Sequence, residues 1–266
     1  MTPEFSRIRF VMTEPSHPGN VGSAARAIKT MGFGDLVLVA PKVADISTQP
    51  EAISLASGAS DILGNTLILN SLDEALAPVT LAFALTARPR DLGPPACDIR
   101  QAAELGRDHL LEHPDARVAI VVGTERSGLT NEQIGLCHRV CHIPANPEYS
   151  SLNVSQAMQL AAWELRYALL QTQPKNISAE PISTDPGRRP ASADSIIALM
   201  THWQEALEAV EFLNPAHPKK LMPRMRHLFT RNNLTQDEVD MMRGVCTAMI
   251  QTAKFGVRKP GERNPR

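Results

Sequence analysis

The chain has 266 residues, of which 43% are hydrophobic, so it can bury one substantial core with room for a small appendage. It has no apolar run of 18 residues, and its first residues, M-T-P-E-F-S, lack the layout of a secretory signal, so we expect a soluble cytoplasmic protein without a membrane span. The 27 lysines and arginines balance 28 acidic residues, which excludes a strongly basic molecule that binds polyanions through its bulk charge.

Short β-branched or aliphatic runs alternate with helical patterns over the first 170 residues. The runs that predict strands cover residues 7–12, 36–40, 66–70, 79–86, 117–123 and 139–144. The helices are expected to begin near residues that include good N-caps, namely Asn20, Gln49, Ser71, Asp98, Thr130 and Asn153. This alternation predicts an α/β fold in which a mostly parallel sheet has helices on both faces.

A glycine cluster, S-H-P-G-N-V-G-S-A-A-R-A at residues 16–27, follows the first predicted strand. Its spacing fits neither the dinucleotide fingerprint G-x-G-x-x-G nor the P-loop, and the second predicted strand ends without an acidic residue, which disfavours a nicotinamide-dependent enzyme. We expect Gly19 and Gly22 to let the helix begin close to the strand. Arg26 would then follow inside the helix.

The sequence C-H-R-V-C-H at residues 137–142 has the residue types of a metal or haem site but not the spacing. Three residues separate its cysteines where the haem motif has two, and no second ligand pair lies nearby. Four cysteines in a chain of this length also do not form a disulfide framework. We therefore expect no metal.

The remainder of the chain predicts a separate small helical unit. Residues 171–192 hold four prolines and no apolar periodicity, which predicts a Pro-rich linker. Helical patterns at 193–213, 217–230 and 235–254 predict an all-helical extension over 193–254, followed by a basic, disordered tail at 255–266. The segment 217–231 is basic and without acidic residues, so its lysines and arginines form either a solvated helix face or a phosphate-contacting one; they include Lys219, Lys220, Arg224 and Arg226.

Four loops follow strands, and these are the loops at which an open parallel sheet binds ligands. They are rich in Gly, Ser and Asn, and arginines lie in or just after them: Arg26, Arg88, Arg90 and Arg126. Each loop alone has a structural explanation, as a tight turn or a helix cap. Together, backbone-rich loops with arginine forks favour a polyanion plus a small cofactor that brings its own reactive group.

Three of these loops resemble, in order, the three motifs of the SPOUT-class RNA 2'-O-methyltransferases: G-N-V-G-S-A-A-R-A, V-G-T-E-R-S-G-L and I-P-A-N-P-E-Y-S-S-L-N-V-S-Q-A-M. With the helical extension, the chain resembles the TrmJ-type tRNA methyltransferases over about residues 5–170 and 193–254. The resemblance implies a SPOUT domain over residues 1–170 with a C-terminal trefoil knot, and a homodimer. It also implies that the enzyme uses S-adenosylmethionine to methylate the ribose 2'-hydroxyl of nucleotide 32, cytidine or uridine, in the tRNA anticodon loop.

The same resemblance assigns roles to individual residues. It implies that the cofactor lies against Leu85, Thr86, Ala87, Gly123, Ile143, Ser150, Ser151 and Leu152. Arg26 matches the essential arginine of the family, and Ser151 would orient the same hydroxyl. The other implied motif or RNA-contact residues are Asn20, Arg88, Glu125 and Asn153, of which Asn153 would hold the knot loop and cap the helix.

Two questions stay open at this point. Arg26 either binds the phosphate next to the target ribose and polarises the hydroxyl, or acts transiently as a base in a dry complex, although a guanidinium is normally protonated. The same motifs also serve enzymes that methylate ribosomal RNA or another tRNA position, and a non-catalytic RNA-binding relative is a further alternative.

Overall fold

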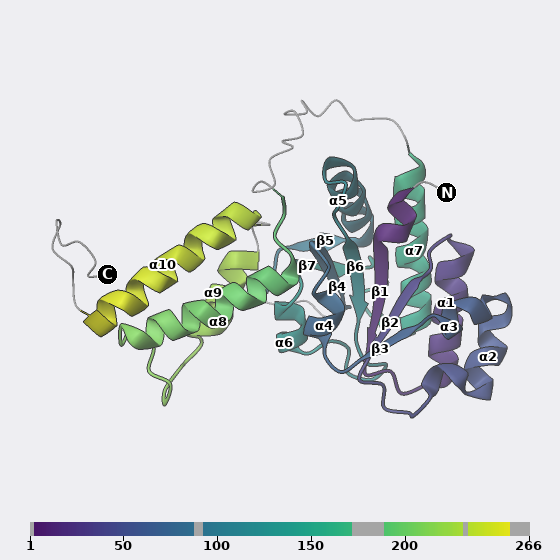
Figure 1. The fold of residues 1–266 in the computed structure, drawn as a ribbon. Helices are drawn as coiled ribbons and strands as arrows, with labels where there is room; N and C mark the ends of the chain where they lie inside the picture. The colour runs from purple at the N-terminus through teal and green to yellow at the C-terminus, as the bar shows by residue number, and fades with distance from the viewer. Residues whose placement is uncertain (1–2, 88–92, 172–188, 231–233, 256–266) are drawn as a thin grey trace.

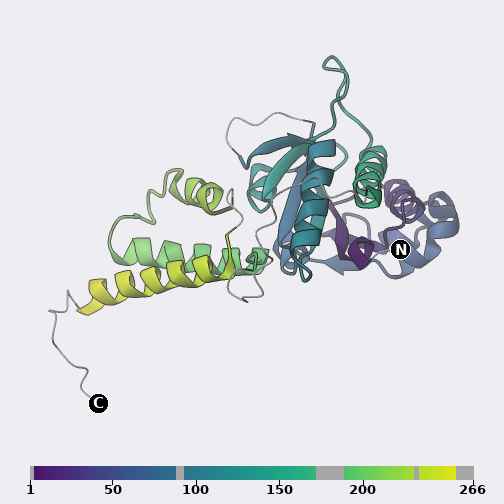
Figure 2. The same cartoon turned by 90° about the horizontal axis from the view of Figure 1, so that it is seen from above.

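The structure is a computed structural model that describes residues 3–87, 93–171, 189–230 and 234–255. Its main body is a sheet with helices on both faces, and an elongated helical extension projects from one side of this body in both views (Figures 1 and 2). No helix in these ranges is both long enough and apolar enough to cross a bilayer.

Seven strands form one sheet in the order β3-β2-β1-β6-β4-β7-β5, and every neighbouring pair is parallel. The strands are β1 (Ile8–Thr13), β2 (Asp35–Val39), β3 (Leu67–Leu69), β4 (Leu81–Leu85), β5 (Ala96–Asp98), β6 (Val118–Val122) and β7 (Arg139–His142). The central strands are uniformly apolar and buried because helices cover both faces of the sheet.

The helices of the sheet domain fall into two layers. They are α1 (Pro18–Thr30), α2 (Pro50–Ala56), α3 (Ser60–Gly64), α4 (Leu72–Leu76), α5 (Ile99–Glu112), α6 (Asn131–Gly135) and α7 (Val154–Leu170), with short 3-10 turns at Pro3–Arg7, Ile46–Thr48 and Ser57–Ala59. One core joins side chains of α1, α5 and α7 to one face of the sheet, with α2 and α3 packed beside α1. A second core joins α4 and α6 to the other face.

The predicted α/β architecture is confirmed, and six of the seven strands are where the apolar runs predict them. The N-caps Ser71, Asp98 and Thr130 each accept a hydrogen bond from a backbone N–H in the first turn of their helix. The prediction missed β5, a three-residue strand at the sheet edge beside β7. The strand order by itself does not define a knot, so the trefoil knot stays a prediction.

The extension consists of α8 (Ala193–Ala209), α9 (Leu221–Thr230) and α10 (Gln236–Phe255), close to the three predicted helices. These helices enclose a small core of their own, whose buried members include Leu199, Phe229 and Val239. Ala193 joins the extension to the sheet domain, because its N–H donates to the Val79 carbonyl oxygen (2.9 Å) and its side chain lies in the second core.

The predicted linker and tail lie largely outside the described residues. The last residues of the 171–192 segment are described, and they pair with residues at the start of α10 and just before it: Ala191 N donates to Leu234 O (2.7 Å) and Gln236 N donates to Arg189 O (2.8 Å). The proposed division of the chain into domains, linker and tail stays a prediction.

Candidate active site

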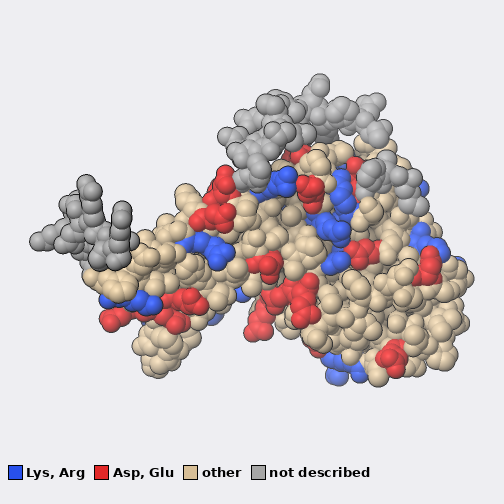
Figure 3. Space-filling model, in the orientation of Figure 1, with Lys and Arg blue, Asp and Glu red and all other residues tan. Residues whose placement is uncertain are grey.

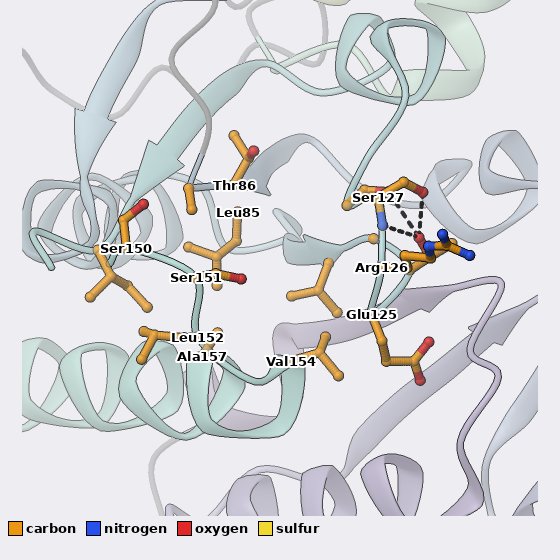
Figure 4. A pocket seen from close by; sticks show the side chains of 16 residues that line it. Leu85, Thr86, Glu125, Arg126, Ser127, Ser150, Ser151, Leu152, Val154 and Ala157 are labelled. Atoms are coloured by element: carbon orange, nitrogen blue, oxygen red, sulfur yellow. Dashed lines mark hydrogen bonds between the residues drawn. The ribbon is translucent and has the colours of Figure 1, made fainter. Parts of the chain in front are cut away.

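Three loops at the carboxyl ends of β4, β6 and β7 surround a hollow, and the start of α7 forms its floor (Figure 4). The residues lining it are Leu85, Thr86, Ala87, Val122, Gly123, Thr124, Glu125, Arg126, Ser127, Gly128, Ile143, Ser150, Ser151, Leu152, Val154 and Ala157. The structure thus brings together all eight residues predicted to contact the cofactor. Their role in binding it stays a prediction.

The loop after β6 is a tight turn that depends on glycine. A Cβ at Gly123 would collide with the backbone of Gly128 and Leu129, and Gly128 itself has φ +69°, in the left-handed region. Gly128 N donates to Thr124 O (3.0 Å), and Ser127 N donates to Thr124 Oγ1 (3.1 Å). The turn therefore holds a fixed shape beside the hollow.

Gly22 has a different role from the predicted one. A Cβ on Gly22 would collide with the backbone of Ala52, and a Cβ on Gly19 would crowd the side chains of Glu51 and Leu55. Both glycines face α2, so the prediction that they bring the helix close to the strand was wrong. They permit two helices to pack closely at the point where α1 begins.

Glu125, in the loop after β6, caps the amino end of α1. Its carboxylate accepts hydrogen bonds from Ser16 N (3.2 Å), Ser16 Oγ (2.8 Å), His17 N (3.2 Å) and Asn20 Nδ2 (3.3 Å). The residue at the N-cap position, His17, makes no capping hydrogen bond with its own side chain. A negative charge here also interacts favourably with the helix dipole.

These contacts also determine the protonation state of Glu125. Burial raises the pKa of its carboxyl, but hydrogen bonds from its own backbone, from Ser16 and from Asn20 outweigh burial and leave the pKa below its ordinary value. Glu125 is therefore ionised at neutral pH and is a poor general base, because its oxygens are already engaged.

Asn20 connects Glu125 to the loop after β7. Asn153 Nδ2 donates to Asn20 Oδ1 (2.9 Å), while Asn153 Oδ1 accepts from Ser155 N (2.9 Å), Ser155 Oγ (2.6 Å) and Gln156 N (3.4 Å). Asn153 thus caps α7, as the sequence predicts. The side chains of Glu125, Asn20 and Asn153 form a continuous chain, called here the three-residue bridge, between two walls of the hollow.

Arg26 is not among the residues that line the hollow. It lies on the exposed side of α1, six residues beyond Asn20, which corresponds to about 9 Å along the helix axis. The structure therefore does not bring Arg26 into the hollow that Ser151 lines. Arg88, the other arginine predicted to meet RNA, lies outside the described residues.

The basic residues of the extension are divided between solvent and an interface. Lys219, Lys220 and Arg224 are exposed, whereas Arg226 is partly buried and faces α6, where its Cδ would lie 3.6 Å from a Cβ at Gly135. The four therefore do not form a single solvated helix face. None of them lines the hollow.

Charge on the visible face of the molecule is mixed. Figure 3 shows lysines and arginines interspersed with acidic residues over both the sheet domain and the extension. On this face, affinity for a polyanion would depend on a few individual cations.

Two residues at the site, Ser16 and His17, were not assigned roles by the sequence, and Arg126 was only grouped with the loop arginines that favour a polyanion. Ser16 and His17 stand in the same loop as Gly19, but only the structure shows that Glu125 lies opposite their N–H groups. Arg126 lines the hollow beside Glu125. The feature of the sequence that pointed to Arg126 was its position in a loop after a strand.

The lining of the hollow suits a group-transfer reaction in which the cofactor is the reactive partner. It combines apolar side chains with hydroxyls and loop backbone, and its one carboxylate is already engaged. All four cysteines of the chain are buried and unpaired, none of them is a lining residue, and burial raises the pKa of Cys137 to about 12. In the described ranges, no cluster of three or more His, Cys, Asp or Glu has an arrangement that could hold a metal ion.

Comparison with known proteins agrees with this architecture. The model of the SpoU rRNA Methylase family matches residues 7–163, which is more than half of the chain and includes all three loops of the hollow. The chain belongs to the SpoU methylase family, and it is a methyltransferase.

The extension and the full-length relatives define the type within that family. A model described as the tRNA methyltransferase TrmJ C-terminal domain matches residues 194–257. The tRNA (cytidine/uridine-2'-O-)-methyltransferase TrmJ of Yersinia enterocolitica is 41% identical over 256 residues, which is 94% of each chain. The chain is of the TrmJ type, and the resemblance predicted from its motifs is confirmed.

Two solved structures support the same conclusion. TrmJ from Z. mobilis ZM4 is 28% identical, has a TM-score of 0.75, and the match covers 91% of this chain and 98% of that one. A probable methyltransferase from Bordetella pertussis Tohama I is 72% identical, with a TM-score of 0.61, over 64% of this chain and 99% of that one.

Proposed function

We propose that this chain transfers a methyl group from S-adenosylmethionine to the ribose 2'-hydroxyl of nucleotide 32, cytidine or uridine, in the anticodon loop of tRNA. The reaction on tRNA is the one named for relatives that are about two-fifths identical to almost the whole chain. The observation that carries the proposal is the hollow, in which three loops, two of them motif loops, meet at the carboxyl ends of the neighbouring parallel strands β6, β4 and β7. We expect the reaction to occur in the cytoplasm.

The hollow has the chemistry to hold such a cofactor. Leu85, Ile143, Leu152 and Val154 offer apolar walls for a flat base, and the loops offer backbone N–H and C=O groups beside the hydroxyls of Ser150 and Ser151. When bound, S-adenosylmethionine supplies a sulfonium-activated methyl group, so the protein has only to orient the acceptor hydroxyl and assist loss of its proton.

Arg26 fits a positioning role better than a role as base. Its side chain is exposed on α1, and a solvated guanidinium stays protonated. We assign it to a phosphate beside the target ribose, where its charge also polarises the hydroxyl. Ser151, on the wall of the hollow, helps to orient the same group.

A homodimer is part of this proposal. The outer face of α7 carries a stripe of exposed apolar side chains at helical spacing, Leu160, Trp163, Tyr167 and Leu170, each 40–55% exposed. Exposed apolar patches of this kind mark association surfaces, and we propose that a second copy covers it. Trp163→Glu should shift the sedimentation coefficient to that of a monomer; an unchanged value would place the interface elsewhere.

The test of the function is methyl transfer with mapping of the product. Purified protein is incubated with methyl-labelled S-adenosylmethionine and either unmodified tRNA or the same tRNA carrying a 2'-deoxynucleotide at position 32. We expect one methyl group on nucleotide 32 of the first and none on the second. Label at another tRNA nucleotide, or only in ribosomal RNA supplied in parallel, would overturn the assignment in favour of a different target.

A further inference from the structure

The two charged side chains that line the hollow differ in whether they have partners. Of its two charged side chains, Glu125 uses its carboxylate oxygens to hold Ser16, His17 and Asn20. Arg126 is exposed and forms no ion pair or hydrogen bond through its side chain with any residue that the structure describes. The guanidinium donors of Arg126 are therefore free to bind an anion, whereas the oxygens of the ionised Glu125 are already engaged.

Arg126 also occupies a fixed place. It follows Glu125, which is tied to α1, and precedes Ser127, whose N–H and hydroxyl both bond to Thr124 Oγ1 (3.1 and 2.8 Å). The residues on each side of Arg126 are thus held, and its side chain lies beside Ser127 and points away from the opposite wall of Ser150, Ser151 and Leu152 (Figure 4). Pre-organisation of this kind lowers the entropic cost of binding a ligand.

We propose that Arg126 binds a phosphate group of the tRNA substrate at the mouth of the hollow and so positions the target ribose against the methyl donor. This inference rests on the proposed function. The guanidinium fork matches phosphate oxygens, and phosphates are the groups that a nucleic acid presents around every ribose. An arginine on the wall of the hollow also means that the exposed Arg26, which does not line the hollow, need not orient the ribose alone.

One other anion shares this chemistry, namely the carboxylate at the amino-acid end of the cofactor. That end also carries an ammonium group and lies next to the sulfonium, so an extra cation there meets like charge. This consideration and the exposure of Arg126 favour the phosphate. Binding of S-adenosylhomocysteine and of 5'-methylthioadenosine, which lacks the amino-acid end, separates the two sources.

The experiment compares Arg126→Ala and Arg126→Lys with Arg117→Ala, a control at the opposite end of β6, where Arg117 is 43% exposed. We expect Arg126→Ala to raise the Kd for tRNA about tenfold and to reduce its dependence on log salt by about 0.7, the loss of roughly one phosphate contact. Affinity for S-adenosylhomocysteine should stay within about twofold. Arg126→Lys should recover the salt dependence, because it keeps the charge, but not the full affinity. Arg117→Ala should change neither.

Two results would overturn the inference. One is unchanged tRNA affinity and salt dependence in Arg126→Ala. The other is a loss of S-adenosylhomocysteine affinity with 5'-methylthioadenosine unaffected, which would assign Arg126 to the cofactor carboxylate. If the unmodified protein itself methylates no tRNA, the proposed function fails; if it does, and Arg126→Ala is equally active and binds tRNA equally, only this inference fails.

Discussion

The arginines at the two ends of the sheet differ in what they bind. At the amino ends of the strands, Arg9 is buried, and its guanidinium donates to Asp35 Oδ2 and to the Ala75 carbonyl oxygen (both 2.9 Å). Arg7 donates to carbonyl oxygens near the end of α5, among them Leu110 O (3.0 Å). At the carboxyl end of β6, Arg126 is exposed, and Arg26 is exposed further along α1; neither has a described partner for its side chain.

Arginines with partners inside the protein have a structural role, whereas exposed arginines without partners are free to bind a ligand. A guanidinium whose donors are satisfied inside the protein contributes to stability, whereas an exposed one without a partner adds little to stability and can bind an anion. Substitution of the partnered arginines at the amino ends of the strands should therefore change the free energy of unfolding. Substitution of the exposed Arg26 or Arg126 should change RNA binding or methyl transfer.

The largest effect is expected at Arg26. Arg26→Ala should lower kcat/KM for tRNA methylation by about a hundredfold to a thousandfold, the cost of removing one aligned charged donor, and Arg26→Lys should retain part of the activity. The free energy of unfolding should change by less than about 0.5 kcal/mol, because the side chain is exposed. Steady-state methyl transfer and urea denaturation measure the two quantities. Near wild-type transfer in both variants would show that Arg26 has no role in the reaction.

Acid should lower the free energy of unfolding through two buried histidines near the amino ends of the strands. His138 Nδ1 accepts from Ala82 N (3.0 Å), and His109 Nε2 bonds to Thr80 Oγ1 (2.8 Å). Burial lowers the pKa of His109 to about 3 and that of His138 to about 4. Since the histidines of the unfolded chain are protonated near pH 6.5, their contribution to stability is complete above that pH and is lost as the pH falls toward 4, by about 4 kcal/mol between pH 7 and pH 5.

Urea denaturation at a series of pH values measures this loss. His138→Asn keeps an acceptor for the Ala82 N–H but cannot be protonated, so it should flatten the pH dependence. His217→Asn, at an exposed residue, is the matched control and should leave it unchanged. A His138→Asn protein with the full wild-type pH dependence would show that this histidine is not the titrating group.

Arg9→Met should cost about 3 kcal/mol of unfolding free energy, because it leaves a carbonyl oxygen and Asp35 without their main partner. Arg117→Ala should cost less than about 1 kcal/mol, since its contact with Asp35 is 4.0 Å long and partly exposed. Both values come from urea denaturation, and methyl transfer per folded molecule should be retained. If Arg9→Met is fully folded but has lost methyl transfer, Arg9 is not a purely structural arginine and the comparison fails.

The smallest effect is expected in the extension. Combined substitution of Lys219, Lys220 and Arg224 by Ala should weaken tRNA binding about tenfold and reduce its salt dependence, with cofactor affinity unchanged. Filter binding at several salt concentrations and calorimetry with S-adenosylhomocysteine measure these quantities. Equal loss of both affinities would indicate a role in folding instead.

The fold was largely predictable because fully buried parallel strands are continuous apolar runs and because N-caps such as Asp98 and Thr130 precede the helices. The strand β5 was not predictable, since it has three residues and follows two prolines. Apolar runs also carry no information on strand order, which here places β6 between β1 and β4.

The sequence predicted which loops form the site, but not which side chains in it contact one another. Strand-end loops and motif resemblance identified the eight residues that the structure brings together around the hollow. The roles of Gly22 and Glu125 could not be read from the sequence, because each depends on a distant partner. Gly22 faces Ala52 of another helix, and Glu125 accepts hydrogen bonds from Ser16 and Asn20.

The three-residue bridge has a consequence for how the enzyme becomes active. Its contacts join Asn20 to Glu125 across 105 residues and Asn20 to Asn153 across 133 residues. Contacts of such long sequence separation form late, because the chain between them must first be ordered. A nascent or partly folded chain therefore has no complete hollow, and the ability to bind the cofactor reports that nearly the whole sheet domain has reached its native topology.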